Sequence, residues 1–171
     1  MGYKWQGGIM IIGEGDVASA IIDKESLLFF ASGVSNSQET RESEYQREKD
    51  LLLIQDRKQH SVYFGSLCIF YADTRYARHK REMEELVKEN FGRYTIVRLG
   101  NITWGNNPHT LINYFKARKQ AGEPIEVRDE YRYVVDREEF RHWLGLIPDF
   151  NCEMNIPGRR MKVREIVEEL V

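Results

Sequence analysis

The sequence predicts an α/β fold in which helices cover both faces of a parallel sheet. Two observations support this prediction. Short apolar runs of strand length alternate along the chain with longer segments of helical pattern, which is the order of βαβ units. In addition, the earliest runs, residues 8–12 and 27–31, are continuously apolar, as expected of strands buried on both faces.

The first unit reads as strand, helix, strand. Residues 8–12 are apolar and rich in isoleucine, and the run ends at glycines. Residues 16–22 combine small side chains with a spacing compatible with a helix, and residues 27–31 form the second strand. A strand, a helix and a further strand in this order form the repeating unit of a parallel sheet.

The alternation of strands and helices continues through the middle of the chain. After a polar loop at residues 32–38, apolar residues within a run of mixed charge predict an amphipathic helix over 45–54, whose charged side chains face solvent. The next elements are a strand over 61–65, a helix over 74–90 and a strand over 94–99.

The last third of the chain is less regular. Its predicted elements are a helix over 110–121, strands near Ile125 and Tyr133, a helix over 138–144, a strand over 153–156 and a helix over 163–170. No repeat, low-complexity tract or long linker sets this part aside. We therefore expect one compact unit, with a core over residues 1–105 and a small C-terminal region over 106–171 packed on it.

Composition limits the classes of partner. The 171 residues include 25 Lys and Arg and 27 Asp and Glu, which gives a formal net charge of −2. With 42% hydrophobic residues the chain can bury a substantial core. A sequence pI of about 6.1 leaves no excess of basic side chains for a phosphate backbone, so nucleic acid is not expected as a partner.

The cysteines and the lengths of the apolar runs predict where in the cell the protein is found. Cys68 and Cys152 are isolated from each other and from the four histidines, so neither a metal site nor a disulfide framework is predicted. The longest apolar runs are far shorter than the roughly 20 residues that span a bilayer, and no signal peptide precedes them. The expectation is a cytoplasmic protein that does not contact a membrane.

A glycine motif lies between the first strand and helix. Gly13-Glu14-Gly15-Asp16-Val17-Ala18 fits the pattern G-x-G-x-x-A. In dinucleotide sites the glycines allow a tight turn and close approach of the backbone to a pyrophosphate, and the small sixth residue lets the helix pack closely on the strand. Two features depart from that fingerprint. Glu14 and Asp16 place negative charges in the turn, and no acidic residue follows about 20 positions further on, where the fingerprint has a ribose ligand. The alternative is a turn that only redirects the chain.

Tyr76 and Lys80 are four positions apart on a predicted helix, which puts both side chains on one face. An ammonium beside a phenol favours the phenolate and lowers the pKa from about 10 toward the range of a general acid or base. The alternative is a chance pair on an exposed helix. His79 is offset from both residues and is expected to face solvent or pack on its neighbour.

Ser66 follows a predicted strand ten residues before Tyr76, at the kind of position where open α/β sheets bind ligands. Together, the glycine motif, Ser66, Tyr76-x-x-x-Lys80 and the segment Arg98-Leu99-Gly100-Asn101-Ile102-Thr103-Trp104-Gly105 make the chain resemble the extended short-chain dehydrogenase/reductase family. Within it, the NAD-dependent nucleotide-sugar epimerases and dehydratases are most similar. The resemblance runs in order over most of the chain.

The resemblance implies a Rossmann-like fold, NAD or NADP as cofactor, and a hydroxylated, nucleotide-linked sugar as substrate. Tyr76 would be the general base, Lys80 would lower its pKa and hold the cofactor ribose, and Ser66 would orient the substrate oxygen. The implied cofactor-binding residues are Gly13, Gly15, Ala18, Ala31, Ser32, Gly33, Tyr76 and Lys80. Residues 1–105 would then be a truncated dinucleotide-binding core and 106–171 a substrate region.

Two later motifs extend the resemblance to the substrate. Asn101 would lie at the substrate pocket, with Trp104 where the family usually has tyrosine. Arg132, in Arg132-Tyr133-Val134-Val135-Asp136, is similar to the arginine that pairs with a sugar-nucleotide phosphate in relatives, and a guanidinium binds phosphate oxygens bidentately. The alternative for Arg132 is an ordinary surface cation, and the loop at 31–37 could equally be a polar turn.

The chain departs from the family between Ala18 and Leu27. Only eight residues stand where the family has a strand, a helix and a further strand, so the second and third strands are lost. The lost segment normally carries the residue that reads the adenosine ribose. Its loss also leaves the strand at 8–12 on a sheet edge, and exposed apolar edges invite pairing. We expect the Met1–Gln6 arm, a second copy in a homo-oligomer, or another segment to cover it.

Two functions are therefore open. The first is an NAD(P)-dependent oxidoreductase, epimerase or dehydratase with a Ser66-Tyr76-Lys80 site, which retention of all three residues favours. The second is a non-catalytic ligand-binding or regulatory protein on a cut-down dehydrogenase scaffold, which the eight-residue gap favours. A purely structural assembly subunit has no motif in its support.

Overall fold

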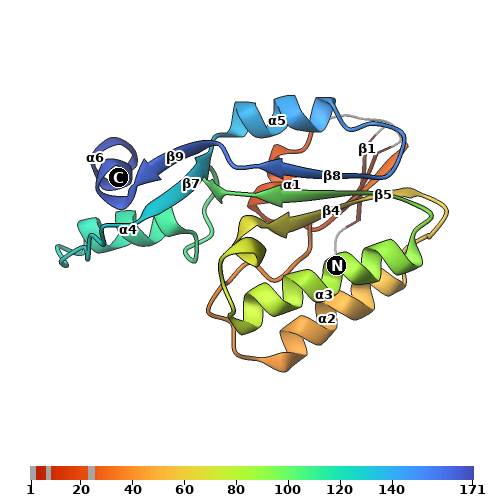
Figure 1. The fold of residues 1–171 in the computed structure, drawn as a ribbon, viewed down its shortest axis with the longest axis horizontal. Coiled ribbons are helices and arrows are strands. Elements are labelled where there is room, and N and C mark those ends of the chain that lie inside the picture. The colour runs from red at the N-terminus through yellow and green to blue at the C-terminus, as the bar shows by residue number, and fades with distance from the viewer. Residues whose placement is uncertain (1–2, 7–8, 23–25) are drawn as a thin grey trace.

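The fold is built on a six-stranded sheet in the order β1-β2-β3-β4-β5-β8, with a three-stranded sheet, β6-β7-β9, beyond the carboxyl ends of the main strands (Figure 1). A computed structural model describes residues 3–6, 9–22 and 26–171. The strands are β1 (Tyr3–Gln6), β2 (Ile9–Ile12), β3 (Leu27–Phe30), β4 (His60–Ser66), β5 (Arg93–Leu99), β6 (Asn101–Ile102), β7 (Tyr131–Val135), β8 (Cys152–Ile156) and β9 (Arg159–Lys162). The helices are α1 (Asp16–Ala20), α2 (Glu42–Leu53), a 3-10 helix η1 (Leu67–Phe70), α3 (Arg75–Asn90), α4 (Leu111–Gln120), α5 (Arg137–Gly145) and α6 (Val163–Leu170).

The central strands run parallel, as the sequence predicts. On either side of β4, Tyr63 pairs in register with Phe30 of β3 and with Ile96 of β5. All residues of β4 up to Gly65 are buried, which agrees with a strand covered on both faces. The predicted Rossmann-like α/β fold is confirmed.

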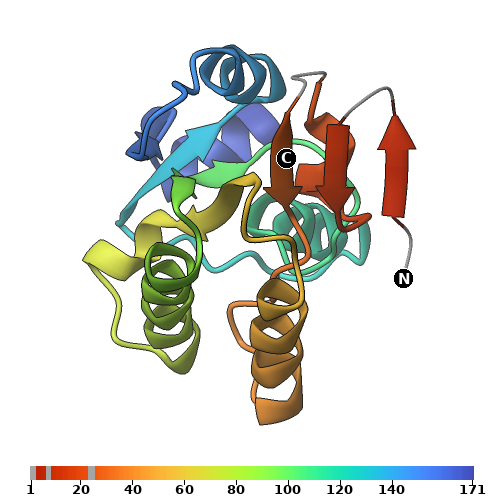
Figure 2. The ribbon, with the colours of Figure 1, turned by 90° about the vertical axis from the view of Figure 1, so that its right-hand side faces the viewer.

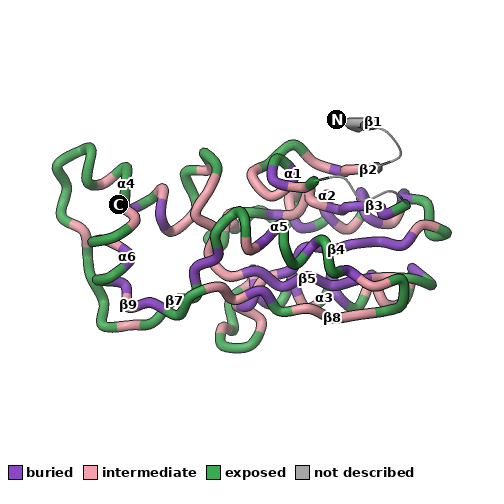
Figure 3. Tube along the Cα trace, turned by 90° about the horizontal axis from the view of Figure 1, so that it is seen from above, coloured by how far each residue is buried: buried purple, intermediate pink, exposed green. Residues whose placement is uncertain are grey.

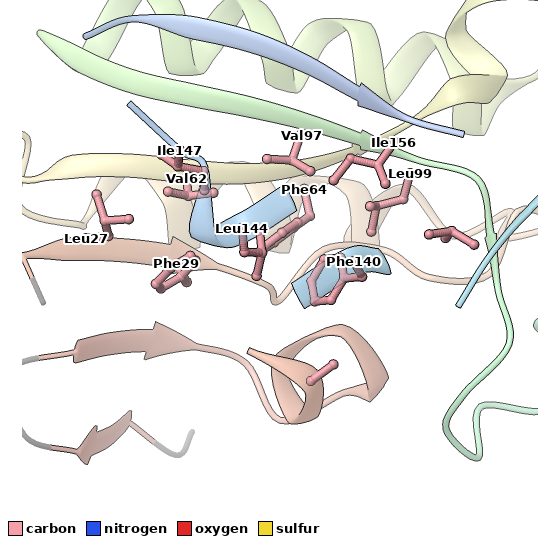
Figure 4. Close-up of a cluster of buried hydrophobic side chains, with 12 residues drawn as sticks. Leu27, Phe29, Val62, Phe64, Val97, Leu99, Phe140, Leu144, Ile147 and Ile156 are labelled. Atoms are coloured by element: carbon pink, nitrogen blue, oxygen red, sulfur yellow. The ribbon is translucent and has the colours of Figure 1, made fainter. Parts of the chain in front are cut away.

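Alternate side chains of the central strands point to opposite faces of the sheet. Phe29 and Val62 belong to the core beneath α1 and α5, and Figure 4 shows these side chains with Phe140 of α5 among them. Their neighbours Phe30 and Tyr63 belong to the core beneath α2 and α3. Figure 3 shows the buried segments gathered along β3, β4 and β5. The two cores explain why the strands read as continuously apolar runs.

The connections from β2 to β3 and from β3 to β4 step along the sheet in the same direction but cross opposite faces. The short helix α1 lies on the face of α5, where Arg141 Nε donates to the Ala20 carbonyl at 3.0 Å. Helix α2 lies on the other face, with Leu51 and Leu52 in that core. The two crossovers therefore have opposite hands, and the helices that follow β2 and β3 lie on opposite faces of the sheet.

The edge of β2 is covered by the N-terminal arm. Strand β1 pairs with β2 in an antiparallel register, with Lys4 opposite Ile11 and Gln6 opposite Ile9, and Figure 2 shows it at the margin of the sheet. Of the three coverings expected from the sequence, the arm is the one observed. The predicted first strand began at Gly8, which lies outside the described residues.

A smaller lobe packs α4 and α6 on the sheet β6-β7-β9. Its core consists of Ile112, Phe115, Val134, Met161, Val163 and Ile166. The division expected at residue 105 does not follow the sheets. β6 lies before it and joins the small sheet, whereas β8 lies after it and pairs with β5 in the main sheet.

Some elements differ from the predicted ones. β6, β9 and η1 were not expected, and residues 123–128 around Ile125 form no strand. β9 has the sequence Arg-Arg-Met-Lys, which contains no apolar run, because only Met161 of the four faces the core. Among the described helices, none has the length and apolar character that would carry it across a bilayer.

Candidate functional site

The residues that the sequence singled out near the glycine motif converge at the carboxyl ends of β2, β3 and β4. Gly13 and Gly15 follow β2, the loop at 31–34 follows β3, and Ser66 ends β4. The first half of α3 supplies Tyr76 and Lys80. Because α1 and α2 leave neighbouring strands toward opposite faces, this is the position at which open α/β sheets bind ligands.

The two glycines of the motif have different roles. Gly13 has φ of +124°, and a Cβ there would lie 2.4 Å from the carbonyl oxygen of Ala31. It is therefore needed for contact between the loops after β2 and β3. No atom lies within 4 Å of a Cβ built on Gly15, so that its backbone faces open space that a ligand could enter. Ala18 is buried within α1.

Replacing Gly13 by alanine is expected to lower the free energy of unfolding by about 1–3 kcal/mol, because the new methyl group meets Ala31 and φ is unfavourable. Gly15→Ala is the matched control and is expected to change it by less than about 1 kcal/mol. Urea unfolding followed by circular dichroism measures both. Equal losses in the two variants would contradict the structural role of Gly13.

Ser66 lies where β4 passes into the 3-10 helix η1. Its Oγ accepts a hydrogen bond from the Cys68 N–H at 3.2 Å, and this contact caps the start of η1. The Ser66 hydroxyl is also near enough to the Tyr76 phenol to act on its pKa. Burial raises the pKa of the Tyr76 phenol well above its usual range; Cys68 and Glu48 add to this, and Ser66 acts against it. The phenol is therefore protonated at neutral pH.

Lys80 is buried and bound to groups of the protein. Its Nζ donates to Glu48 Oε1 at 3.1 Å and to the Tyr63 hydroxyl at 3.3 Å, and it lies 5.5 Å from the centre of the Tyr76 ring. The expected lowering of the Tyr76 pKa is not found, because burial of the phenol, with Cys68 and Glu48 adding to it, raises that pKa. Tyr76 and Lys80 do share one side of α3, as their spacing predicts.

Glu48 is the centre of a buried polar cluster that the sequence did not reveal. Besides Lys80, it accepts hydrogen bonds from the Val34 N–H at 2.7 Å and the Tyr63 hydroxyl at 2.8 Å, and it binds His79 Nε2 at 2.8 Å. Glu48 and His79 are both fully buried. Of the two placements expected for His79, exposure to solvent is excluded, and the expectation that the charged face of α2 is solvated is wrong at Glu48.

The stability of the protein is expected to fall at acid pH through Glu48. Burial acts to raise the pKa of this carboxyl, but Lys80 and His79 outweigh it and hold the pKa well below its usual range. A carboxyl whose pKa is depressed on folding stabilises the protein fully above its unfolded pKa, about 4.3, and less as the pH falls below that value.

Urea unfolding between pH 7 and pH 3 tests this pH dependence. The wild type should lose stability below about pH 4.3 more steeply than Glu48→Gln, which has no carboxyl to protonate at this position. Parallel pH profiles for the two proteins would contradict the assignment.

The loop after β3 rests on this cluster. A Cβ on Gly33 would lie 2.7 Å from Lys80 Nζ and 2.9 Å from Glu48 Oε1, so that only glycine fits without displacing them. Arg47 Nη2 donates to the Ser32 carbonyl at 3.1 Å. The structure therefore brings together the predicted loop residues and Lys80.

The two predicted substrate residues lie in the small sheet. Asn101 Nδ2 donates to the Tyr133 carbonyl at 2.9 Å, which joins β6 to β7. Arg132 forms an ion pair with Glu130. Asp16 of the glycine motif is also used within the protein, because its carboxylate accepts the N–H groups of Asn106 and Asn107 at 3.0 and 2.9 Å.

An open groove of about 420 Å³ lies elsewhere, between α2 and α3. Leu53 and Leu86 line it together with the acidic row Glu82, Glu85 and Glu89. None of the predicted site residues lines this groove. Among the described residues, no three His, Cys, Asp or Glu side chains are grouped so as to hold a metal ion.

No protein-family model matches the chain, and no curated protein matches it in sequence. Solved structures match its fold. UDP-glucose 4-epimerase from Thermus thermophilus, in complex with NAD, is 17% identical with a TM-score of 0.64, over 84% of this chain and 60% of that one. dTDP-4-dehydrorhamnose reductase from Bacillus anthracis, in complex with NADP, is 13% identical with a TM-score of 0.66, over 85% and 61%.

A third structure, the Bordetella bronchiseptica enzyme WbmG in complex with NAD and UDP, is 14% identical with a TM-score of 0.64, over 84% of this chain and 54% of that one. The chain thus spans between 54% and 61% of the length of these three proteins. The fold expected from the resemblance is therefore confirmed, and the chain matches only part of each of these structures.

Proposed function

We propose that the protein is an NAD(P)-dependent oxidoreductase, epimerase or dehydratase that acts on a hydroxylated, nucleotide-linked sugar through Ser66, Tyr76 and Lys80. The observation that carries the proposal is that Ser66 at the end of β4 lies at the same edge of the sheet as Tyr76 and Lys80 of α3, with Lys80 Nζ 5.5 Å from the centre of the Tyr76 ring. The three solved structures reported above contain NAD or NADP, and one of the three also contains UDP.

The residues at the carboxyl ends of β2 and β3 fit a dinucleotide. The open space at Gly15 would admit a pyrophosphate, and the loop containing Ser32 and Gly33 passes directly over Lys80. When bound, the cofactor would supply hydride transfer. Asn101 and Arg132, in the small lobe, would contact the sugar nucleotide, and Arg132 would exchange its contact with Glu130 for a phosphate.

The proton chemistry follows from the state of Tyr76. A protonated phenol can donate a proton to a substrate oxygen, whereas it becomes a base only if a positive charge stabilises the phenolate. Ser66, at the end of β4, would orient the same oxygen. Tyr76 would therefore act first as a general acid.

Product analysis tests the proposed activity. Stoichiometric protein is incubated with NAD or NADP and with UDP- and dTDP-linked sugars, and the nucleotide sugars are separated by anion-exchange chromatography. Conversion of a sugar, absent in Tyr76→Phe, is the expected result. Unchanged sugars in every combination, with a dinucleotide demonstrably bound, would contradict catalysis.

One observation favours a second candidate, a non-catalytic ligand-binding or regulatory protein on the same scaffold. Lys80 is engaged by Glu48 and Tyr63 and is only 3% exposed, so that it offers no free ammonium to a ribose. A sugar nucleotide that binds tightly without any dinucleotide would support this candidate.

A further inference from the structure

The ammonium of Lys80 is fully used within the protein. It carries three hydrogens, and three acceptor atoms lie within reach: Glu48 Oε1 at 3.1 Å, Glu48 Oε2 at 3.4 Å and the Tyr63 hydroxyl at 3.3 Å. Its position is therefore set by α2 and β4 before any ligand arrives.

Glu48 also binds the loop that follows β3. Its Oε2 accepts the Val34 N–H at 2.7 Å, and Gly33 in the same loop has no room for a Cβ above Lys80 Nζ. One carboxylate on α2 thus holds the loop, Tyr63 of β4 and Lys80 of α3 at a single point. All of these groups belong to, or directly support, the site proposed above.

We propose that Glu48 is a positioning residue, which fixes Lys80 beneath Gly33 and thereby aligns the loop at 31–34 with the Tyr76–Lys80 pair. The inference deepens the proposed function and rests on it. Glu48 acts through Lys80 and the loop rather than through contact with a substrate. The Glu48 carboxylate also sets the charge near Tyr76, whose ring centre lies 5.5 Å from Lys80 Nζ. With Glu48 ionised, Tyr76 lies beside a neutral ion pair; without that charge, it lies beside the Lys80 cation.

The chain offers a matched control for a purely structural ion pair. Glu84 is also a buried glutamate, on α3, and it binds Arg98 through contacts of 2.9 and 2.7 Å. These contacts lead to β5 and not to Lys80 or the loop at 31–34. Glu84→Gln therefore removes a comparable buried charge without touching the proposed alignment.

The test compares wild type, Glu48→Gln and Glu84→Gln by nuclear magnetic resonance and by NADH titration. In the wild type we expect a slowly exchanging ammonium signal for Lys80, assigned by its loss in Lys80→Arg, and a protected Val34 amide. In Glu48→Gln the Lys80 ammonium signal should disappear. The Val34 amide should exchange at least tenfold faster, with the Val97 amide of β5 as the reference. The Kd for NADH should rise at least tenfold. Glu84→Gln should leave all three unchanged.

The outcomes separate this inference from the proposed function. If the wild type binds no NADH or NADPH, the proposed function fails, but the two magnetic-resonance signals still decide the role of Glu48. Unchanged signals in Glu48→Gln, or equal changes in both variants, overturn the inference.

If Glu48→Gln does not fold, Tyr63→Phe removes one acceptor of Lys80 and keeps the carboxylate. Faster exchange of the ammonium with an unchanged Val34 amide is then expected, and an unchanged ammonium signal overturns the inference.

Discussion

Tyr76→Phe is expected to reduce conversion of a nucleotide sugar by about 10²–10⁴-fold, because general acid and base groups contribute effects of this size. The phenol is the group proposed to exchange a proton with the substrate, and its ring centre lies 5.5 Å from Lys80 Nζ. Removing only its oxygen leaves the ring beside Lys80 and the fold intact. The affinity for the dinucleotide should therefore remain nearly unchanged, and single-turnover assays together with NADH titration measure the two effects separately.

Tyr71→Phe is the control for this variant. Tyr71 follows η1, and its side chain is largely exposed, so that loss of its hydroxyl should leave conversion at the wild-type rate. Retention of full activity in Tyr76→Phe would remove Tyr76 from the mechanism. A parallel loss of dinucleotide affinity would show instead that the substitution disturbs the site as a whole.

Glu48→Ala is expected to have the largest effect on stability, a loss of about 3–5 kcal/mol. Removing one partner of a buried ion pair leaves the other charge buried without compensation. Here the substitution would leave the Lys80 ammonium, which is 3% exposed, without its counter-ion. It would also remove the acceptor of the Val34 N–H. Urea unfolding at pH 7, followed by fluorescence and circular dichroism, measures the loss.

Glu42→Ala provides the contrasting case on the same helix. Glu42 binds Arg75 at 2.7 Å, but its side chain is 69% exposed. Surface pairs of this kind contribute at most about 1 kcal/mol. If the two variants were equally stable, the Glu48 cluster would not be the buried charge centre that the distances describe.

The sequence predicted the strands and helices of the main sheet well, because buried parallel strands carry continuous apolar runs. It did not predict β9, an edge strand of the small sheet in which three of the four residues are charged. β9 has no apolar run of its own, and its partner β7 is distant in the sequence. For the same reason, the split of the C-terminal third between two sheets could not be deduced from composition.

The candidate site was predicted in part. The spacing of Tyr76 and Lys80 and the place of Ser66 after a strand were sufficient to bring these residues together. Glu48 could not be found, because it lies 32 residues from Lys80 in the sequence and within a run of mixed charge typical of a solvated helix. Only the packing of α2 on α3 shows that this carboxylate points inward. The close approach of Gly13 to Ala31 could not be predicted either, because it depends on how the loops after β2 and β3 meet.

The most direct test of the central claim, that the shortened scaffold retains a dinucleotide site, is a calorimetric titration of the protein with NAD(H) and NADP(H), alone and then with a nucleotide sugar. The account predicts micromolar affinity for one dinucleotide, weakened by Gly15→Ala and unaffected by Glu84→Gln. No binding at millimolar concentration would contradict it and would leave Ser66, Tyr76 and Lys80 as parts of a non-catalytic scaffold.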